Sequence, residues 1–310
     1  MKFAKLKNES SFIFGLTKEA PFYRWADFQN LFKNDKVVSG VESLLDWIEH
    51  HEHLEAWLKS QAERLSSLKP VEFSLSQLDI PFRPLSFRDF YAFEEHVKNG
   101  RRSRGLEMID DWYQFPVFYY SNHLNMKAPG DEIHFPKGAK ALDFEMEIGC
   151  IVGKKSRNLS LEDASKAIFG FCLLNDFSAR DVQKKEMALN MGPAKGKDFA
   201  SSFGPIIYTK DEFQSCRKEK LFDLDLTMKL NGEEVCRSNA SKIHYSFEEM
   251  LVRASADCDL FPGELLGSGT LGRGCLMEKN LDSEPRWLQT KDEVSLGWSW
   301  DSFPLNHQVA

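Results

Sequence analysis

The sequence has no long apolar run, no paired-cysteine motif and no excess of positive charge. Among its 310 residues no run approaches the about 18 apolar residues of a membrane-spanning helix, and its N-terminus lacks the apolar core of a signal peptide. None of the six cysteines has CxxC spacing, so reduced, mostly buried thiols are expected. The formal net charge of −7 argues against a general binder of nucleic-acid phosphates. A soluble, cytoplasmic globular protein is therefore expected, with no nucleic-acid or membrane partner.

Chain length and the positions of prolines predict two domains, since 310 residues correspond to about two domains as a prior. Two short strand-like runs, MKFAKL and SFIFGL, precede a stretch from Val41 to Leu68 with apolar side chains at helical spacing. The prolines of PFRP at 81–84 mark a boundary. We expect a small N-terminal α/β domain at residues 1–78 and a larger domain at residues 79–310.

The larger domain is predicted to be mainly β with inserted helices, so the fold class is α+β. Asn-Gly between two alternating runs is the strongest short hairpin signal, because both residues accept positive φ. That hairpin turn is expected at Asn231–Gly232, and helices are expected near residues 86–99, 160–169, 178–188 and 246–257.

The segment LDFEMEIG, Leu142–Gly149, alternates acidic and apolar residues. A period of two indicates a strand, which places Asp143, Glu145 and Glu147 on one face and apolar side chains on the other. Carboxylates that share a face repel one another, and burying each without a partner costs several kcal/mol. Either this face is solvated or a cation lies on it, and the segment alone leaves both possibilities open.

Further acids favour the cation. Asp176 ends the apolar run FGFCLLND, where an acid is unusual unless something pairs with it. Asp89 and His96 are seven residues apart, so they share a face of the helix expected at 86–99. Asp89, Glu145, Glu147 and Asp176 would supply oxygen ligands to a hard divalent cation. Such a set suits Mg²⁺, Mn²⁺ or Ca²⁺ and does not suit Zn²⁺.

Two polar segments follow the acid at 176. Arg180, Gln183 and Met187 lie at i, i+3 and i+7 on one face of an expected helix. The Gly/Pro-rich loop MGPAKGKDF holds Lys195 and Lys197, and spacing alone does not choose between them. The segment GELLGSGTLGRGC contains a formal GxGxxG without the helix of a dinucleotide fold, so its glycines are expected to let the backbone approach a ligand.

Taken together, these segments resemble the fumarylacetoacetate hydrolase family. The resemblance is carried by RDFYAFEEH, LDFEMEIG, NDFSARDVQ, GPAKGKDF and LGSGTLGRGC, in the family's order, over residues of about 85–280. It implies a catalytic domain built as a mixed β-sandwich roll behind a small N-terminal domain, and a homodimer. It also implies Mg²⁺, Mn²⁺ or Ca²⁺ bound by Asp89, Glu145, Glu147 and Asp176.

The resemblance also implies roles for other residues. A His–Glu pair that activates water is matched by His96 and Glu278. Oxyanion and enolate stabilisation is matched by Arg180, Gln183 and Lys197, which favours Lys197 over Lys195. Substrate-contacting positions are matched by Tyr91, Arg104, Tyr119 and Thr270.

The implied activity is hydrolysis of a C–C bond in a β-diketo acid, fumarylacetoacetate or a related acylpyruvate, as in aromatic amino acid catabolism. One alternative is a 2-oxo acid decarboxylase of the oxaloacetate type, or an enol–keto isomerase, on the same metal site. Another is a metal- or ligand-binding protein without catalysis. Met187 and Ser201 replace a tyrosine and a threonine of the family, which leaves the metal chemistry intact and the natural substrate open.

Overall fold

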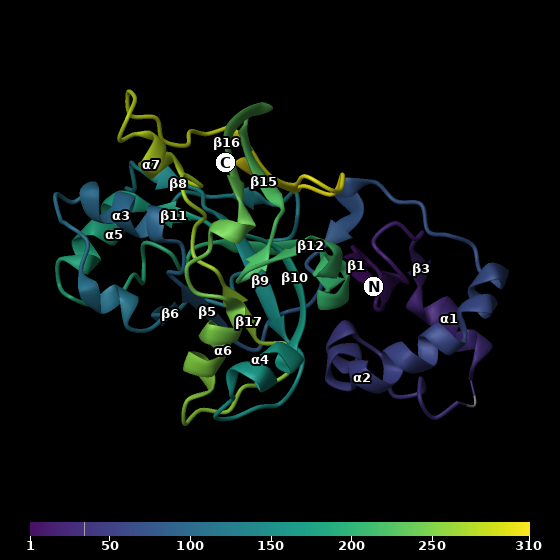
Figure 1. Cartoon of the computed structure of the whole chain (residues 1–310). Helices are drawn as coiled ribbons and strands as arrows, with labels where there is room; N and C mark the ends of the chain where they lie inside the picture. The colour runs from purple at the N-terminus through teal and green to yellow at the C-terminus, as the bar shows by residue number, and fades with distance from the viewer. Residues whose placement is uncertain (34) are drawn as a thin grey trace.

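The fold is built around two β-sheets, and the computed structural model describes residues 1–33 and 35–310 (Figure 1). Most neighbouring strands are antiparallel, whereas β17 pairs with β5 and β19 with β7 in parallel. The large sheet has ten strands: in spatial order β3 (Tyr23–Arg24), β2 (Phe12–Gly15), β1 (Lys2–Leu6), β12 (Ser201–Thr209), β10 (Ile168–Asp176), β9 (Met146–Val152), β17 (Leu265–Gly267), β5 (Phe87–Phe90) and β6 (Phe118–Tyr120), with β4 (Leu78–Asp79) also paired to β1. The five-stranded sheet has the order β16 (Glu233–Asn239), β15 (Asp225–Leu230), β18 (Glu293–Trp298), β19 (Leu305–Val309) and β7 (Glu132–Ile133). Two short pairs are β8 (Leu142–Asp143) with β11 (Ser178–Ala179), and β13 (Arg217–Lys218) with β14 (Leu221–Phe222).

Helices lie at the edges of these sheets, α1 and α2 on one side of the molecule and α3, α5 and α7 on the other (Figure 1). The α-helices are α1 (Trp25–Leu31), α2 (Leu44–Ser60), α3 (Glu94–Arg102), α4 (Leu161–Ala167), α5 (Arg180–Met187), α6 (Phe247–Ser255) and α7 (Leu276–Lys279). Short 3₁₀ helices span Ala62–Ser67, Leu75–Gln77, Asp110–Tyr113, Lys210–Cys216 and Ala240–Lys242. Over the described ranges, no helix combines the length and apolarity needed to cross a membrane.

Several local predictions are confirmed, and the mainly β, mixed class is as expected. The helices predicted near 160–169, 178–188 and 246–257 are α4, α5 and α6. Asn231 and Gly232 join β15 to β16 with φ angles of 53° and 82°, the positive values that a tight hairpin turn requires.

The N-terminal region begins as predicted, with β1 and β2 in place of MKFAKL and SFIFGL. α2 starts at a capping box in which Ser43 and Asp46 bind each other's backbone N–H groups, and its α-helical part ends at Ser60. β1 pairs with β12, so the first strand is part of the large sheet. The boundary between residues 78 and 79 remains a prediction.

The prediction of a helix over residues 86–99 is wrong in its first half. Residues Phe87–Phe90 form β5, fully buried between β17 and β6, and α3 begins only at Glu94. Pairing on both edges satisfies the backbone of β5, and this tertiary environment overrides the local helical pattern. Asp89 and His96 therefore come from different elements and not from one helix face.

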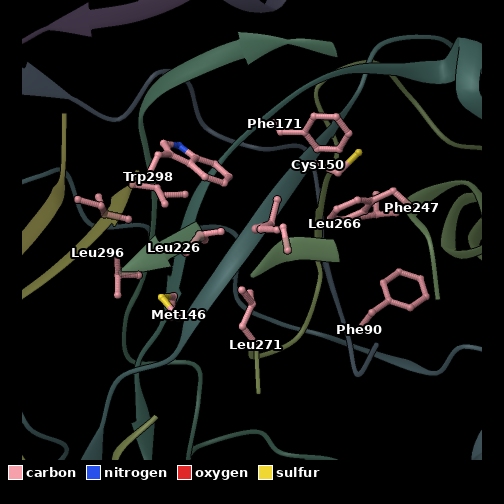
Figure 2. Packing of buried hydrophobic residues seen from close by; sticks show 14 of the residues in the cluster. Phe90, Met146, Cys150, Phe171, Leu226, Phe247, Leu266, Leu271, Leu296 and Trp298 are labelled. Atoms are coloured by element: carbon pink, nitrogen blue, oxygen red, sulfur yellow. The ribbon is translucent and has the colours of Figure 1, made fainter. Parts of the chain in front are cut away.

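The acidic strand is real but interrupted. β8 ends at Asp143 and β9 begins at Met146, with Glu145 in an isolated bridge to Cys275. Every residue of β9 is buried, so Glu147 lies on no solvated face. Met146 instead faces the apolar core between the two sheets, with side chains from several strands around it (Figure 2). The same core also contains these residues labelled in Figure 2: Cys150, Phe171, Leu226, Leu266, Leu271, Leu296 and Trp298.

Candidate active site

A cavity of about 520 Å³ opens beside the ends of β5 and β9, between α3 and α5. This volume falls within the usual range of small-molecule sites. All the predicted site residues line it except Asp176 and Glu278, which contact residues that do. The topology thus brings together segments that are up to about 180 residues apart in sequence, as in the His96–Glu278 pair.

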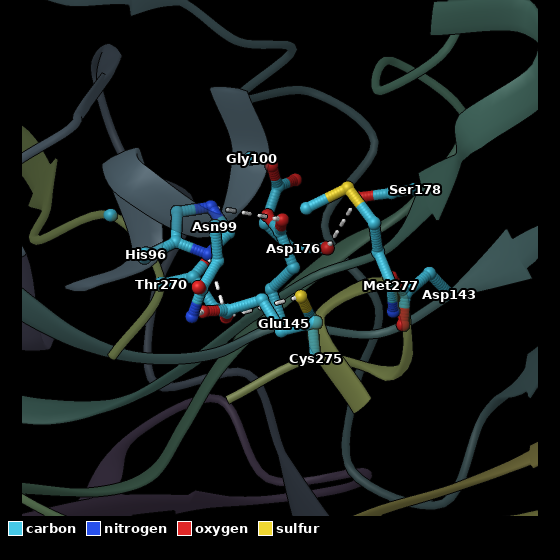
Figure 3. A network of polar contacts seen from close by, with 12 residues as sticks. His96, Asn99, Gly100, Asp143, Glu145, Asp176, Ser178, Thr270, Cys275 and Met277 are labelled. Atoms are coloured by element: carbon cyan, nitrogen blue, oxygen red, sulfur yellow. Dashed lines mark hydrogen bonds and ion pairs between the residues drawn. The ribbon is translucent and has the colours of Figure 1, made fainter. Parts of the chain in front are cut away.

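Three of the four predicted metal ligands are connected by two shared donors. The Tyr119 hydroxyl lies 2.9 Å from Asp89 Oδ2 and 2.7 Å from Asp176 Oδ2. Lys197 Nζ lies 2.6 Å from Asp176 Oδ2 and also contacts Glu145 Oε2. Figure 3 shows Glu145 and Asp176 near each other, with His96 close by. Tyr119 therefore contacts the acids directly, beyond the substrate contact that the sequence predicted.

The carboxylates of Glu147 and Asp89 both lie close to Gly267, which has no side chain. The Gly269 N–H donates to Glu147 Oε2 over 3.1 Å. Gly267 on β17 pairs with Asp89 on β5. A Cβ added to Gly267 would lie 2.3 Å from Asp89 Oδ1 and 3.0 Å from Glu147 Oε2. Only glycine leaves room for both carboxylates at this point, so Gly267 of the GxGxxG motif serves the packing of two acids.

Arg180, at the start of α5, bridges the acidic segment. Its Nε donates to Asp143 Oδ2 over 2.8 Å, its Nη2 to Glu145 Oε1 over 2.6 Å, and its Nη1 to Gln183 Oε1 over 3.1 Å. Burial alone would raise the pKa of Glu145, but the charges of Arg180 and Lys197 outweigh it and hold that pKa below its ordinary value. Glu145 is therefore ionised.

The donor set fits a divalent cation. The buried carboxyl groups of the cluster are Asp89, Asp143, Glu145, Glu147 and Asp176. Within the described part of the chain, the permanent cations that touch them are only Arg180 and Lys197. Asp89 Oδ1 is buried with no hydrogen-bond partner among the described residues. Burial, reinforced by the Asp176 charge, raises the pKa of Asp89 to about 8. Burial, reinforced by Asp89, raises the pKa of Glu147 well above its ordinary value. A hard cation with oxygen ligands would offset this excess of negative charge.

The four acids do not converge tightly on one point. Across residues 1–33 and 35–310, we find one group of three or more His, Cys, Asp or Glu side chains whose ligand atoms all lie within 4.8 Å of one another. That group is His96, Cys275 and Glu278. The Lys197 ammonium group lies between Glu145 and Asp176. The assignment of the four acids as ligands remains a prediction, supported by their charge and by the position of Asp89, Glu145 and Glu147 in the cavity, with Asp176 bound to Lys197 beside them.

His96 and Glu278 form the pair that the resemblance implied. His96 Nδ1 lies 2.7 Å from Glu278 Oε2, and both side chains are buried. Glu278 Oε1 accepts from Asn99 Nδ2 at 2.8 Å and from the Arg273 N–H at 3.1 Å. Burial works against ionisation of Glu278, but its contact with His96 prevails and lowers its pKa. The other ring nitrogen, Nε2, lies 4.0 Å from Glu145 Oε1 and is left facing the acids.

The remaining predicted residues surround the cavity. Arg104 donates to the Gly100 carbonyl over 3.0 Å and contacts Met187 Sδ at 3.9 Å. The Tyr91 ring stands edge-on to His96 at 5.4 Å, and burial raises the pKa of Tyr91 to about 12. Lys195 is exposed and pairs with Asp198, which agrees with the choice of Lys197.

Two further buried side chains take part, Asp143 and Cys275. The alternating pattern left Asp143 either at a strand edge or as an acceptor beside the ligands, and in the structure it is an acceptor. Asp143 accepts from the N–H groups of Leu276 and Met277 at 2.7 and 3.0 Å while it binds Arg180, so it fixes the start of α7 relative to α5. Cys275 Sγ lies 3.4 Å from Glu278 Oε2. Asp143 belonged to the alternating pattern, but no local signal pointed to Cys275.

Comparisons with known proteins show which family this sequence matches. A family model described as fumarylacetoacetate (FAA) hydrolase, C-terminal, matches residues 86–303. Fumarylacetoacetase of Bos taurus is 30% identical over 242 residues, which are 62% of this chain and 58% of the bovine protein. The chain thus spans less than two thirds of that relative's length.

Solved structures share the fold. Fumarylacetoacetate hydrolase from Exiguobacterium antarcticum superimposes with a TM-score of 0.73 at 21% identity, covering 100% of this chain and 99% of that one. Fumarylpyruvate hydrolase from Pseudomonas aeruginosa, solved with Mn²⁺ and pyruvate, gives a TM-score of 0.57 at 19% identity, covering 74% of this chain and 97% of that one. With the family match over most of its length, the chain belongs to the fumarylacetoacetate hydrolase family.

Proposed function

We propose that this chain is a divalent-metal-dependent hydrolase that cleaves a C–C bond in a β-diketo acid, fumarylacetoacetate or a related acylpyruvate. The observation that carries the proposal is the buried His96–Glu278 pair beside an acidic cluster in one cavity. The catalytic domain would be a sandwich roll of residues 79–310, behind a small N-terminal α/β domain. The hydrolase names of its relatives support the reaction class.

The residues of the cavity divide the chemistry among them. A divalent ion such as Mg²⁺ or Mn²⁺, held by Asp89, Glu145, Glu147 and Asp176, would polarise a chelating diketo group as a Lewis acid. Glu278 holds the Nδ1 side of His96, so Nε2 is the nitrogen that accepts a proton from water. The resulting hydroxide attacks the distal carbonyl, and the C–C bond breaks with its electron pair left on the departing fragment as an enolate. The proton that His96 took from water then returns to that carbon.

The charged intermediate needs donors that are already in place. Gln183 accepts from Arg180 with its carbonyl oxygen, which leaves its amide N–H groups free to donate into the cavity. Lys197 is held at its position by Asp176 and Glu145. These contacts raise the pKa of Lys197 although burial opposes them, so the ammonium group stays charged. Preorganised donors of this kind stabilise an oxyanion without reorganisation.

The outer wall of the cavity favours an apolar tail on the substrate. The Asn280 amide is engaged with the Arg286 backbone on both its oxygen and its nitrogen, so it offers little to a ligand. Arg104 and Lys184 also line the cavity, and neither pairs with a carboxylate among the described residues, so they mark the part of this wall suited to an anionic group. The apolar wall residues are Val117, Met187, Met277, Leu281 and Trp287.

A 2-oxo acid decarboxylase of the oxaloacetate type, or an enol–keto isomerase, is the alternative on the same site. Decarboxylation consumes no water-derived nucleophile, so it makes no use of a His–Glu pair that activates water. The pair therefore favours hydrolysis over decarboxylation.

Product analysis in heavy-oxygen water tests the proposal. With Mg²⁺ and acetylpyruvate, we expect pyruvate and acetate in equal amounts, with one heavy oxygen in the acetate. Release of carbon dioxide from oxaloacetate, without any acetate from acetylpyruvate, would instead establish the decarboxylase. His96→Asn serves as the matched control, because it should lose hydrolysis and keep any decarboxylation.

A further inference from the structure

We propose that His96, Cys275 and Glu278 form a second metal site, selective for a thiophilic ion such as Zn²⁺ or Cd²⁺. The site is distinct from the carboxylate cluster, and its occupation stops catalysis. Only this last consequence rests on the proposed function. The existence of the site rests on the three side chains alone.

The spacing of the donor atoms supports the site. Glu278 Oε2 lies 2.7 Å from His96 Nδ1 and 3.4 Å from Cys275 Sγ, and all three ligand atoms lie within 4.8 Å of one another. Ligand atoms around a tetrahedral Zn²⁺ are about 3.3–3.7 Å apart, given metal–ligand bonds of about 2.0–2.3 Å. The thiol and the carboxylate already have this spacing. The imidazole needs to separate from the carboxylate by only about half an ångström.

The donor chemistry sorts the two sites. One thiolate, one imidazole and one carboxylate form a donor set typical of Zn²⁺. The carboxylate cluster offers oxygen alone, which Mg²⁺, Mn²⁺ and Ca²⁺ prefer. A soft ion therefore gains a sulfur ligand only at Cys275, whereas Mg²⁺ gains nothing there.

The position of Cys275 is fixed by the backbone. Its strand-like bridge to Glu145 and the hydrogen bond from the Leu276 N–H to Asp143 hold the buried thiol close behind the cavity residues. Figure 3 shows Cys275 beside Glu145, with His96 across the carboxylates from it. His96 lines the cavity, so an ion reaches the thiol past the imidazole.

Occupation of this site would remove the general base. The ion would displace the Nδ1 proton of His96 and the thiol proton of Cys275 to solvent and bind Nδ1, the thiolate and one oxygen of Glu278, so the hydrogen bond between His96 and Glu278 would be lost. His96 would then be neither oriented nor free to accept a proton from water. Inhibition would follow without displacement of the ion at the carboxylates.

Titration of the Mg²⁺-saturated protein with Cd²⁺ tests the proposal. The thiolate-to-cadmium charge-transfer absorbance reports the site, and turnover of acetylpyruvate reports its effect. In the wild type we expect the absorbance to saturate at one equivalent as turnover falls. In Cys275→Ser the absorbance should be absent and the inhibitory Cd²⁺ concentration at least about tenfold higher. Cys216→Ser, which removes a partly buried thiol outside the cavity, should behave as the wild type.

Each other outcome has a defined meaning. Wild-type protein without the charge-transfer band would overturn the site, whatever the activity. Equal inhibition of the wild type and Cys275→Ser would overturn it too, because Cd²⁺ would then act at the carboxylates. If Cys275→Ser does not fold, His96→Asn should weaken the band at least about tenfold. A band of one equivalent in a protein that hydrolyses no diketo acid would keep the site and refute only the proposed hydrolase.

Discussion

At the scale of single residues, the cavity treats its acids unequally. Glu145 is bound by both Arg180 and Lys197, so it stays ionised. Glu147 has no cation in contact among the described residues and receives only the Gly269 N–H and, at 3.5 Å, the Thr270 hydroxyl. Unequal neutralisation of this kind is common at functional sites. It leaves Glu147 and Asp89 as the acids with most to gain from a divalent cation.

His96→Asn should separate catalysis from metal binding. Loss of the general base should lower kcat by about 10²–10⁴-fold, because acid–base groups typically contribute that much. Affinity for Mn²⁺, measured by the loss of free-ion electron paramagnetic resonance, should stay within about twofold, since His96 is no ligand in the carboxylate cluster. His244→Asn, outside the cavity and packed on Trp112, is the control. Equal losses of kcat and of Mn²⁺ affinity would show that His96 supports the structure and is not the base.

At the scale of elements, the site depends on three adjacent strands. β17 lies between β9 and β5, with Gly267 opposite Gly149 on one side and Asp89 on the other. The two carboxylates of Glu147 and Asp89 can therefore approach only over a residue without a side chain.

Gly267→Ala should weaken metal binding without unfolding the protein. The added methyl group would displace Asp89 Oδ1, and small displacements beside ligands cost about 10–100-fold in metal affinity. Calorimetric titration with Mn²⁺ measures the loss. Gly40→Ala is the matched control, because an added Cβ there meets no atom within 4 Å. Unchanged affinity in Gly267→Ala would contradict the placement of the ion at Asp89 and Glu147.

Elements with a local signal could be predicted from the sequence, and those defined by partners could not. The helices near residues 160–169 and 246–257 were predicted and are α4 and α6, and the Asn231–Gly232 turn located its hairpin. Residues Phe87–Phe90 carry a helical pattern, but two neighbouring strands determine their conformation. The acids of the cluster were found because charge in an apolar run is conspicuous. Cys275 was not found, since an isolated cysteine gives no sign that a histidine from a distant segment of the chain lies near it.

At the scale of the whole molecule, the two sheets meet behind the site. His307 on β19 lies 2.8 Å from Ser202 on β12 and 3.0 Å from the Asp131 carbonyl. Ser201, the residue before Ser202, donates to Asp176 Oδ1 over 2.9 Å. Packing between the sheets therefore supports one acid of the cluster. The homodimer, the cytoplasmic location and the domain boundary remain predictions.

Acid should destabilise the protein through His307. Burial lowers the pKa of His307 from 6.5 to about 4, so the folded state holds the neutral ring. Stability from this residue is present above pH 6.5 and is lost as the pH falls through about 4, by up to about 3 kcal/mol. Urea unfolding in chelator between pH 7 and 4 measures the slope, which His307→Gln should reduce. An equal slope in both proteins would contradict the neutral buried imidazole.

The metal dependence of turnover tests the central claim most directly. The chelated protein is assayed by the ultraviolet decay of fumarylacetoacetate and acetylpyruvate, and Mg²⁺ or Mn²⁺ is then added back to the wild type and to Glu147→Gln. We expect no turnover in chelator, restoration of the wild-type rate by the ion, and a requirement for at least about tenfold more ion in Glu147→Gln. Full turnover of either substrate in chelator, or identical ion requirements in the two proteins, would contradict a metal-dependent hydrolase built on this acidic cluster.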